Sequence, residues 1–189
     1  MAVLPIRISG DPVLHAPAGP VTRFDSELQT LVGDLVDTMH AAPGVGLAAP
    51  QVGVPLRLFV FEYTDPDGVV HSGTAINPTL LISPLPVIEP EDADEEGCLS
   101  FPGERFPLVR STTALLRAVD ADNVPYEIEA SGWLARIFQH EYDHLDGHLY
   151  IDRLPYPFSK AAAKIARKRS WGGPGQSWMP GVDTFDGGA

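Results

Sequence analysis

Five consecutive residues, His140-Glu141-Tyr142-Asp143-His144, constrain the fold of this chain more than any other feature. They lie in a segment that is predicted to be helical, with Ser131 as the N-cap and Gly147 just past its end near Asp146. On a helix, residues i and i+4 lie one above the other, so the two imidazoles can bind one metal ion. Glu141 can then reach water at that ion. The pattern therefore predicts a metal site on a helix; the alternative is two histidines that only satisfy local hydrogen bonds.

A catalytic metal site of this kind needs a third protein ligand and one open position. The chain has a single cysteine, Cys98, which excludes an internal disulfide and a closed cysteine-rich site and indicates a reducing cytoplasm. Cys98 follows an acidic run and Gly97, where a metal-bound thiolate and a buried small side chain are both possible. The third ligand stays open at this point; the candidates are Cys98, His15, His40, His71, His148 and the carboxylates.

A glycine-rich segment, residues 44–53, superficially matches the G-x-G-x-x-A pattern of dinucleotide sites. A predicted helix precedes it where a strand is required, and Pro50 interrupts any following helix, so nucleotide binding is not predicted. We expect instead a backbone loop that approaches a ligand closely, because glycine permits such an approach. Gln51 would offer an amide donor there; the alternative is an ordinary surface glutamine.

The remaining pattern predicts an α+β fold. Apolar residues at helical spacing follow Asp25, a plausible N-cap, and the pattern ends at Pro43-Gly44. Strands are expected at residues 56–63, 69–77, 79–88, 112–119 and 126–130, and another helix at 159–169. Helices and strands do not alternate as βα units, which argues against a doubly wound sheet. We expect a catalytic domain over residues 1–170 and a Gly/Pro-rich tail over 171–189.

Net charge and hydropathy limit the kinds of partner that this chain is expected to bind. The net charge of −12 argues against non-specific nucleic-acid binding by the whole surface, and no specific DNA partner is expected. No apolar run approaches the roughly 20 residues needed to span a membrane, and no signal peptide is visible. An acidic run and a basic run are both expected to be solvated surface. The acidic run comprises Glu89, Glu91, Asp92, Asp94, Glu95 and Glu96; the basic run comprises Lys160, Lys164, Arg167, Lys168 and Arg169.

Three segments together resemble the peptide deformylase family. Its signatures G-x-G-x-A-A-x-Q, E-G-C-L-S and H-E-x-D-H-L stand here at residues 44–51, 96–100 and 140–145, and the resemblance covers essentially residues 1–170. It implies mixed and antiparallel sheets packed around a central metal-binding helix. The implied activity is hydrolysis of the N-formyl group from the N-terminal formylmethionine of new bacterial polypeptides, releasing formate. The tail after Trp171 is similar to that of one bacterial subgroup.

The resemblance also implies residue roles. Cys98, His140 and His144 correspond to the metal ligands, and Glu141 corresponds to the catalytic carboxylate. The donors facing the formyl oxygen correspond to Gln51 and the backbone N–H of Leu99. Substrate-binding positions correspond to Val45, Gly46, Gly97 and Arg105. From helix spacing we add Ile137, which shares the face of His140 and is expected to form the apolar methionine pocket with Val45. Trp133 shares that face too, as pocket wall or ordinary core.

A Cys-His-His set suits Zn²⁺, Co²⁺, Ni²⁺ or Fe²⁺. The resemblance implies Fe²⁺ in the cell, with Zn²⁺ binding but supporting little activity.

Two other functions remain as alternatives. An HExxH metallopeptidase of the metzincin type would carry a third histidine at position 150, where Tyr150 stands. A binding module for N-formyl peptides would not need Glu141.

A substrate that emerges from a ribosome adds one hypothesis about the basic run. Within the basic helix at residues 160–169, one helical stripe is formed by Lys160, Lys164, Arg167 and Lys168. In an acidic protein this stripe is a candidate surface for the phosphate-rich ribosome. The alternative is a basic helix end that complements the helix dipole.

Overall fold

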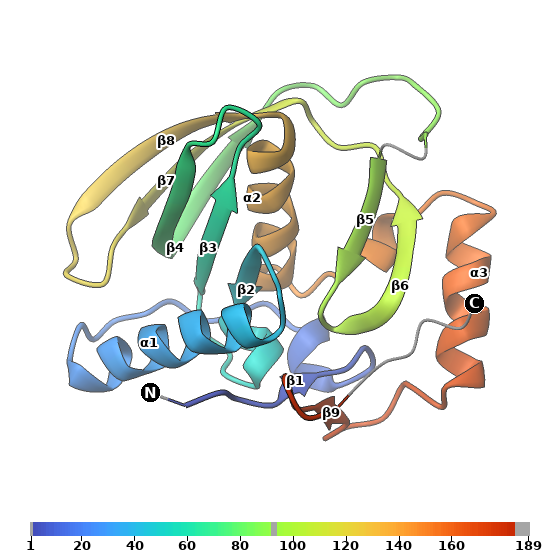
Figure 1. The fold of residues 1–189 in the computed structure, drawn as a ribbon, viewed down its shortest axis with the longest axis horizontal. Helices are drawn as coiled ribbons and strands as arrows, with labels where there is room; N and C mark the ends of the chain where they lie inside the picture. The colour runs from blue at the N-terminus through green and yellow to red at the C-terminus, as the bar shows by residue number, and fades with distance from the viewer. Residues whose placement is uncertain (1, 92–93, 184–189) are drawn as a thin grey trace.

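The computed structural model describes residues 2–91 and 94–183, which form three α-helices, one five-stranded antiparallel sheet and two strand pairs (Figure 1). The helices are α1 (Ser26–Ala41), α2 (Gly132–Leu145) and α3 (Phe158–Lys168), with short 3₁₀ helices η1 (Pro12–His15), η2 (Ala49–Val52) and η4 (Tyr150–Arg153). The strands are β1 (Ile6–Arg7), β2 (Gly46–Ala48), β3 (Leu58–Thr64), β4 (Val70–Ile82), β5 (Glu95–Cys98), β6 (Phe101–Pro107), β7 (Thr113–Val119), β8 (Pro125–Ser131) and β9 (Ser177–Trp178). The α+β prediction is confirmed.

Helix α2 lies between the large sheet and the β5–β6 hairpin (Figure 1). The sheet has the order β2-β3-β4-β7-β8, while β1 pairs with β9 and β5 pairs with β6. Phe138 on α2 packs edge-on against Phe61 of the sheet, with ring centroids 5.0 Å apart. Eleven of the fourteen residues of α2 are buried, including polar ones, so neighbouring elements fix this helix on several sides.

The ends of α2 lie close to their predicted positions. Ser131 is the N-cap in an extended conformation, although its side chain makes no capping hydrogen bond. At the other end Gly147 adopts φ +79°, and the N–H of His148 donates to the carbonyl of Asp143 over 2.9 Å. A Cβ on Gly147 would also strike the backbone of Ala16. Glycine is therefore required here both by conformation and by close packing.

The prediction that Asn77-Pro78 separates two strands is wrong. Strand β4 runs through this dipeptide, and its register with β7 shifts between Ile76 and Thr79. Asn77 adopts φ +49°, and its side-chain amide exchanges two 2.8 Å hydrogen bonds with the backbone of Val21. A bulge of this kind accommodates Pro78, which has no N–H to donate to the ladder. The strand also ends at Ile82 and does not reach residue 88.

The loop predicted for residues 44–53 is also wrong in part. Gly46–Ala48 is strand β2, which pairs with β3, and Ala49–Val52 is the 3₁₀ helix η2. Strand β2 is only three residues long, so the alternation of apolar and polar residues cannot reveal it in the sequence. The same applies to β1 and β9, of two residues each, so strand β9 in the tail was not predicted.

None of the helices in the described ranges has both the length and the apolar character that a membrane span requires.

Candidate metal centre and active site

Three potential metal-binding atoms from β5 and α2 converge on one point. Cys98 Sγ lies 3.3 Å from His144 Nε2, which lies 3.2 Å from His140 Nε2, and the three ligand atoms are all within 4.8 Å of one another. Three of the other candidate histidines make different contacts: His15 accepts from Gly10, His40 pairs with Glu62, and His71 pairs with Asp65. Cys98 is thus the candidate third ligand that joins the two helix histidines.

These atoms fit a bound divalent metal ion. One sulfur and two imidazole nitrogens are donors that Zn²⁺ or Fe²⁺ accepts. Burial alone would lower the pKa of His140, but Cys98 and Glu96 raise it well above its ordinary value. Burial and the charge on His140 hold the pKa of His144 well below its ordinary value. A shared metal ion would give the two imidazoles and the thiol, which lie close together and are buried, a common positively charged partner.

Glu96 holds the ring of His140 through a contact at Nδ1, the ring nitrogen that is not directed at His144. Its Oε1 lies 2.6 Å from His140 Nδ1, which leaves Nε2 pointing toward Cys98 and His144. Only 3% of Glu96 is exposed. Burial would raise the pKa of this carboxyl, but Arg110 and His140 hold it well below its ordinary value. Glu96 is therefore an anion that holds His140 in one tautomer and one orientation.

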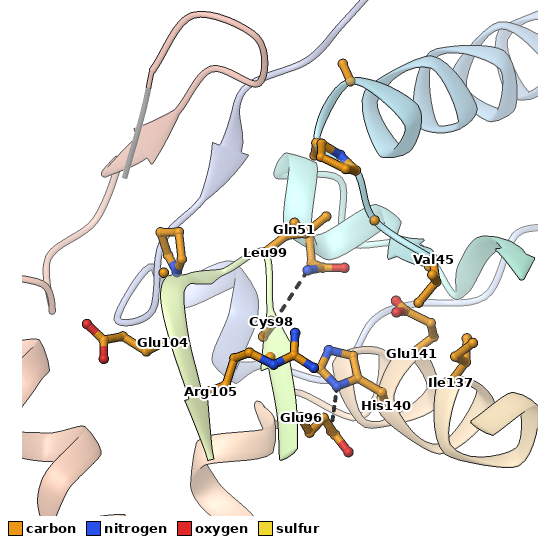
Figure 2. Close-up of a pocket in the computed structure, with 18 of the residues that line it drawn as sticks. Val45, Gln51, Glu96, Cys98, Leu99, Glu104, Arg105, Ile137, His140 and Glu141 are labelled. Atoms are coloured by element: carbon orange, nitrogen blue, oxygen red, sulfur yellow. Dashed lines mark hydrogen bonds and ion pairs between the residues drawn. The ribbon is translucent and has the colours of Figure 1, made fainter. Parts of the chain in front are cut away.

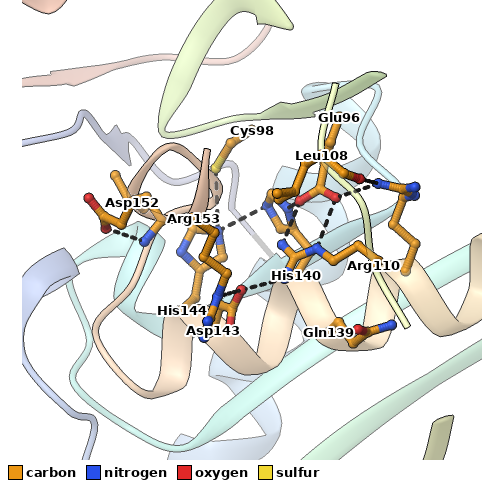
Figure 3. A network of polar contacts seen from close by, with 12 residues as sticks. Glu96, Cys98, Leu108, Arg110, Gln139, His140, Asp143, His144, Asp152 and Arg153 are labelled. Atoms are coloured by element: carbon orange, nitrogen blue, oxygen red, sulfur yellow. Dashed lines mark hydrogen bonds and ion pairs between the residues drawn. The ribbon is translucent and has the colours of Figure 1, made fainter. Parts of the chain in front are cut away.

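The carboxylate of Glu96 belongs to a larger buried network (Figure 3). Arg110 donates to both of its oxygens, over 3.1 and 2.7 Å, and to Asp143 Oδ2 over 2.6 Å. Arg136 donates to Glu96 over 3.1 Å, and Arg153 donates to both oxygens of Asp143. Against the effect of burial, Glu96 and Asp143 raise the pKa of Arg110. The network ties α2 to β5 and η4.

Glu141 lies beside the cluster and lines the cleft (Figure 2). Among the described side chains its Oε2 and His144 Nδ1 are the buried polar atoms without a hydrogen-bond partner. Burial raises the pKa of the Glu141 carboxyl to about 7, and the positive charge of His140 opposes this rise. Such a group can accept or donate a proton near neutral pH.

Gly46 gives the Glu141 carboxylate the space it occupies. A Cβ at position 46 would collide with Oε1 and the carboxyl carbon of Glu141. The first signature segment therefore contains glycine because a strand passes directly over the carboxylate. The close approach to a ligand stays a prediction; the structure shows that strand β2, and not a loop, approaches Glu141.

Gln51 is buried, so the surface-glutamine alternative is wrong. Its Oε1 accepts a 2.9 Å hydrogen bond from the backbone N–H of Ala48. This bond turns Nε2 toward Ser100 Oγ at 3.3 Å and Cys98 Sγ at 3.8 Å. The amide N–H groups of Gln51 therefore point at the region around the cluster.

A cavity of about 780 Å³ opens onto these groups, and its lining includes each residue predicted to bind substrate: Val45, Gly46, Gly97, Arg105 and Ile137. Ile137 is buried and Val45 is half exposed, and both side chains lie near Glu141 (Figure 2). Arg105 lies at the rim, where it donates to the carbonyl of Glu95. Trp133 also lines the cavity; 42% of it is exposed, so it is not core.

Glu96, which the sequence analysis assigned to solvated surface, is the main residue that it missed. Asp94 is likewise paired, with Arg136, whereas Asp92 lies outside the described residues. One signal in the sequence pointed to Glu96. In a strand, residues i and i+2 face the same side, so a strand ending at Cys98 places Glu96 on the same face as the thiol.

Comparisons with known proteins match the chain to peptide deformylases. The sequence pattern of the polypeptide deformylase family matches residues 3–158. The chain is 49% identical to a peptide deformylase of Mycolicibacterium paratuberculosis, covering 96% of each chain, and 49% identical to one of Tropheryma whipplei, covering 94% of each. A solved peptide deformylase from Legionella pneumophila superposes with a TM-score of 0.76 at 38% identity, over 89% of this chain and 96% of that chain.

Gly46→Ala tests the close approach to Glu141. The added methyl group must displace either β2 or the carboxylate, so we expect turnover to fall about 100-fold with bound metal unchanged. Gly19→Ala is the matched control, because a Cβ there meets only the Pro55 carbonyl at 3.7 Å. Equal kcat for Gly46→Ala and the parent would contradict the assignment.

Proposed function

The chain belongs to the peptide deformylase family and hydrolyses the N-formyl group of N-terminal formylmethionine, and we propose that Glu141 carries the proton transfers of this reaction. The observation behind the proposal is a buried carboxylate with a raised pKa at the cleft, beside Cys98, His140 and His144. A general acid–base group needs this combination of access and a pKa near the working pH.

We propose Cys98, His140 and His144 as the ligands of one divalent metal ion. When bound, such an ion supplies Lewis acidity toward water and carbonyl oxygen atoms. We expect Fe²⁺ in the cell, while Zn²⁺, Ni²⁺ or Co²⁺ suit the same sulfur and nitrogen donors in a purified sample. Glu96 would keep His140 oriented toward the ion through the 2.6 Å contact at Nδ1.

In this proposal Glu141 first takes a proton from the attacking water, whose oxygen forms a bond to the formyl carbon. Negative charge then develops on the formyl oxygen, and Gln51 Nε2 and the Leu99 N–H donate hydrogen bonds to it. Glu141 next delivers the proton to the amide nitrogen, the C–N bond breaks, and formate and a free α-amine remain. Loss of a single donor of this type typically lowers kcat by about 10²–10³.

The cavity walls suit a formylmethionyl peptide. We propose that Val45 and Ile137 contact the methionine side chain, and that Gly46, Gly97 and Arg105 contact the peptide. The HExxH metallopeptidase alternative is not favoured, since the matches over nearly the whole chain are peptide deformylases. We also propose a cytoplasmic location, where new formylated chains arise.

Glu141→Gln should retain the metal and lose turnover of a formyl-Met-Ala-Ser peptide by about 10²–10⁴ or more. The amide has nearly the same shape but cannot accept the proton. Formate release and elemental analysis measure the two properties on one sample. An acetyl-Met peptide is the substrate control, and a variant that holds metal and keeps full turnover would remove Glu141 from the proposed role.

Ile137→Asp tests the methionine pocket. A carboxylate in this apolar wall should raise KM for formyl-Met peptides at least about tenfold, because the thioether would lie against an anion. Circular dichroism checks folding, and initial rates give KM. An unchanged KM in folded protein would refute the pocket assignment.

We further propose that the exposed basic face of α3 docks on the ribosome. Lys160, Lys164, Arg167 and Lys168 are exposed, while Arg169 is partly covered and pairs with Glu104 over 3.1 Å. Helix α3 ends beyond the region that the family pattern matches and forms a positive surface on an acidic protein. Phosphate-rich RNA is the surface that such a stripe would bind.

The triple variant Lys164→Ala, Arg167→Ala and Lys168→Ala should bind ribosomes at least about tenfold more weakly and with a shallower dependence on salt. Turnover of a short formyl peptide should stay unchanged, since these residues do not line the cavity. Co-sedimentation over a salt series measures the difference. Equal binding by variant and parent would show that the stripe is only solvated surface.

A further inference from the structure

The C-terminal segment reaches the active-site cleft. Strand β9 pairs with β1 through Ile6 and Trp178, and the two strands lie side by side in Figure 1. The indole N–H of Trp178 donates a 2.8 Å hydrogen bond to the carbonyl of Leu99. Trp178 is nearly buried and, with Gly181 and Asp183, belongs to the cavity lining. The C-terminal segment, which is far from helix α2 in the sequence, thus contacts Leu99, the residue after Cys98.

The segment before β9 is held firmly against the N-terminal residues. Gly10 adopts φ +97°, and a Cβ there would collide with the backbone of Gly172. The N–H of Gly175 donates to Asp11 Oδ2 over 2.8 Å, and the N–H of Ile8 donates to the carbonyl of Gln176 over 3.0 Å. These contacts fix the backbone from which the Trp178 side chain extends.

The turn at residues 98–100 is held on several sides. The carbonyl of Ser100 accepts from the N–H of Ser9 over 2.8 Å, and Ser100 Oγ accepts from Gln51 over 3.3 Å. Leu99 itself is anchored through its carbonyl by Trp178. The Leu99 N–H lies in the peptide plane before its Cα and the carbonyl lies in the plane after it, so the bond from Trp178 fixes one of the two peptide planes that place Leu99.

We propose that Trp178 is a positioning residue for deformylation: its indole N–H holds the carbonyl of Leu99 so that the Leu99 N–H faces the formyl oxygen. This inference rests on the proposed role of that N–H. A donor helps in the transition state only if its direction is fixed before charge develops. The C-terminal strand is then part of the active site, although the sequence analysis assigned residues 171–189 to a separate tail.

Trp178→Phe in the full metal-loaded chain tests the proposal. Phenylalanine keeps an aromatic wall but cannot donate to Leu99. We expect kcat for formyl-Met-Ala-Ser to fall about tenfold, with KM within about twofold, because only transition-state stabilisation is lost. Metal content should be unchanged. Trp171→Phe is the matched control: Trp171 lies in the same segment, packs against Phe101 and is not among the cavity-lining residues, so its kcat should equal that of the parent.

Gly10→Ala is a second variant that displaces the segment without altering Trp178, and it should lower kcat in the same selective way. An unchanged kcat in folded Trp178→Phe, or an equal loss in Trp171→Phe, would overturn the positioning role. So would a loss confined to KM or explained by lost metal. If the metal-loaded parent itself fails to release formate, the proposed function fails first, and the positioning role fails with it.

Discussion

The hydrogen bond between Glu96 and His140 joins the two parts of the molecule on which the site depends. His140 belongs to α2, which packs against the large sheet, whereas Glu96 and Cys98 belong to the β5–β6 hairpin. The 2.6 Å contact at Nδ1 therefore sets the His140 ring and also sets the hairpin relative to the helix. Cys98, two residues from Glu96 on the same face of β5, is thereby brought within reach of both histidines.

Placing Glu96 and Asp143 in the interior is costly unless each carboxylate is fully paired. Arg110 bridges the two, and Arg136 and Arg153 each add contacts to one of them. Removing one partner from such a group typically costs about 3–5 kcal/mol, because an uncompensated charge stays buried. The ion pairs thus specify how α2, β5 and η4 fit together, and they set the positions of the three residues that could hold a metal.

The parts that sequence could predict are those determined by local pattern. Helix α2, its end at Gly147 and the histidine pair follow from periodicity and capping, and Cys98 and Gln51 follow from the resemblance. The parts that were missed depend on distant partners. Glu96 looked like surface because its neighbours are acidic and its arginines lie 14 and 40 residues away. Strands β2 and β9 are two or three residues long and exist through pairing with β3 and β1, while the Asn77 bulge depends on Val21.

The central claim is that one thiolate and two imidazoles, held by the Glu96 network, bind a single metal ion. X-ray absorption at the metal edge of the purified protein, with metal content measured on the same sample, tests it most directly. We predict one metal per chain, bound by one sulfur and two imidazole nitrogens, and loss of the sulfur in Cys98→Ser. A shell without sulfur in the parent, or an unchanged spectrum in Cys98→Ser, would contradict it.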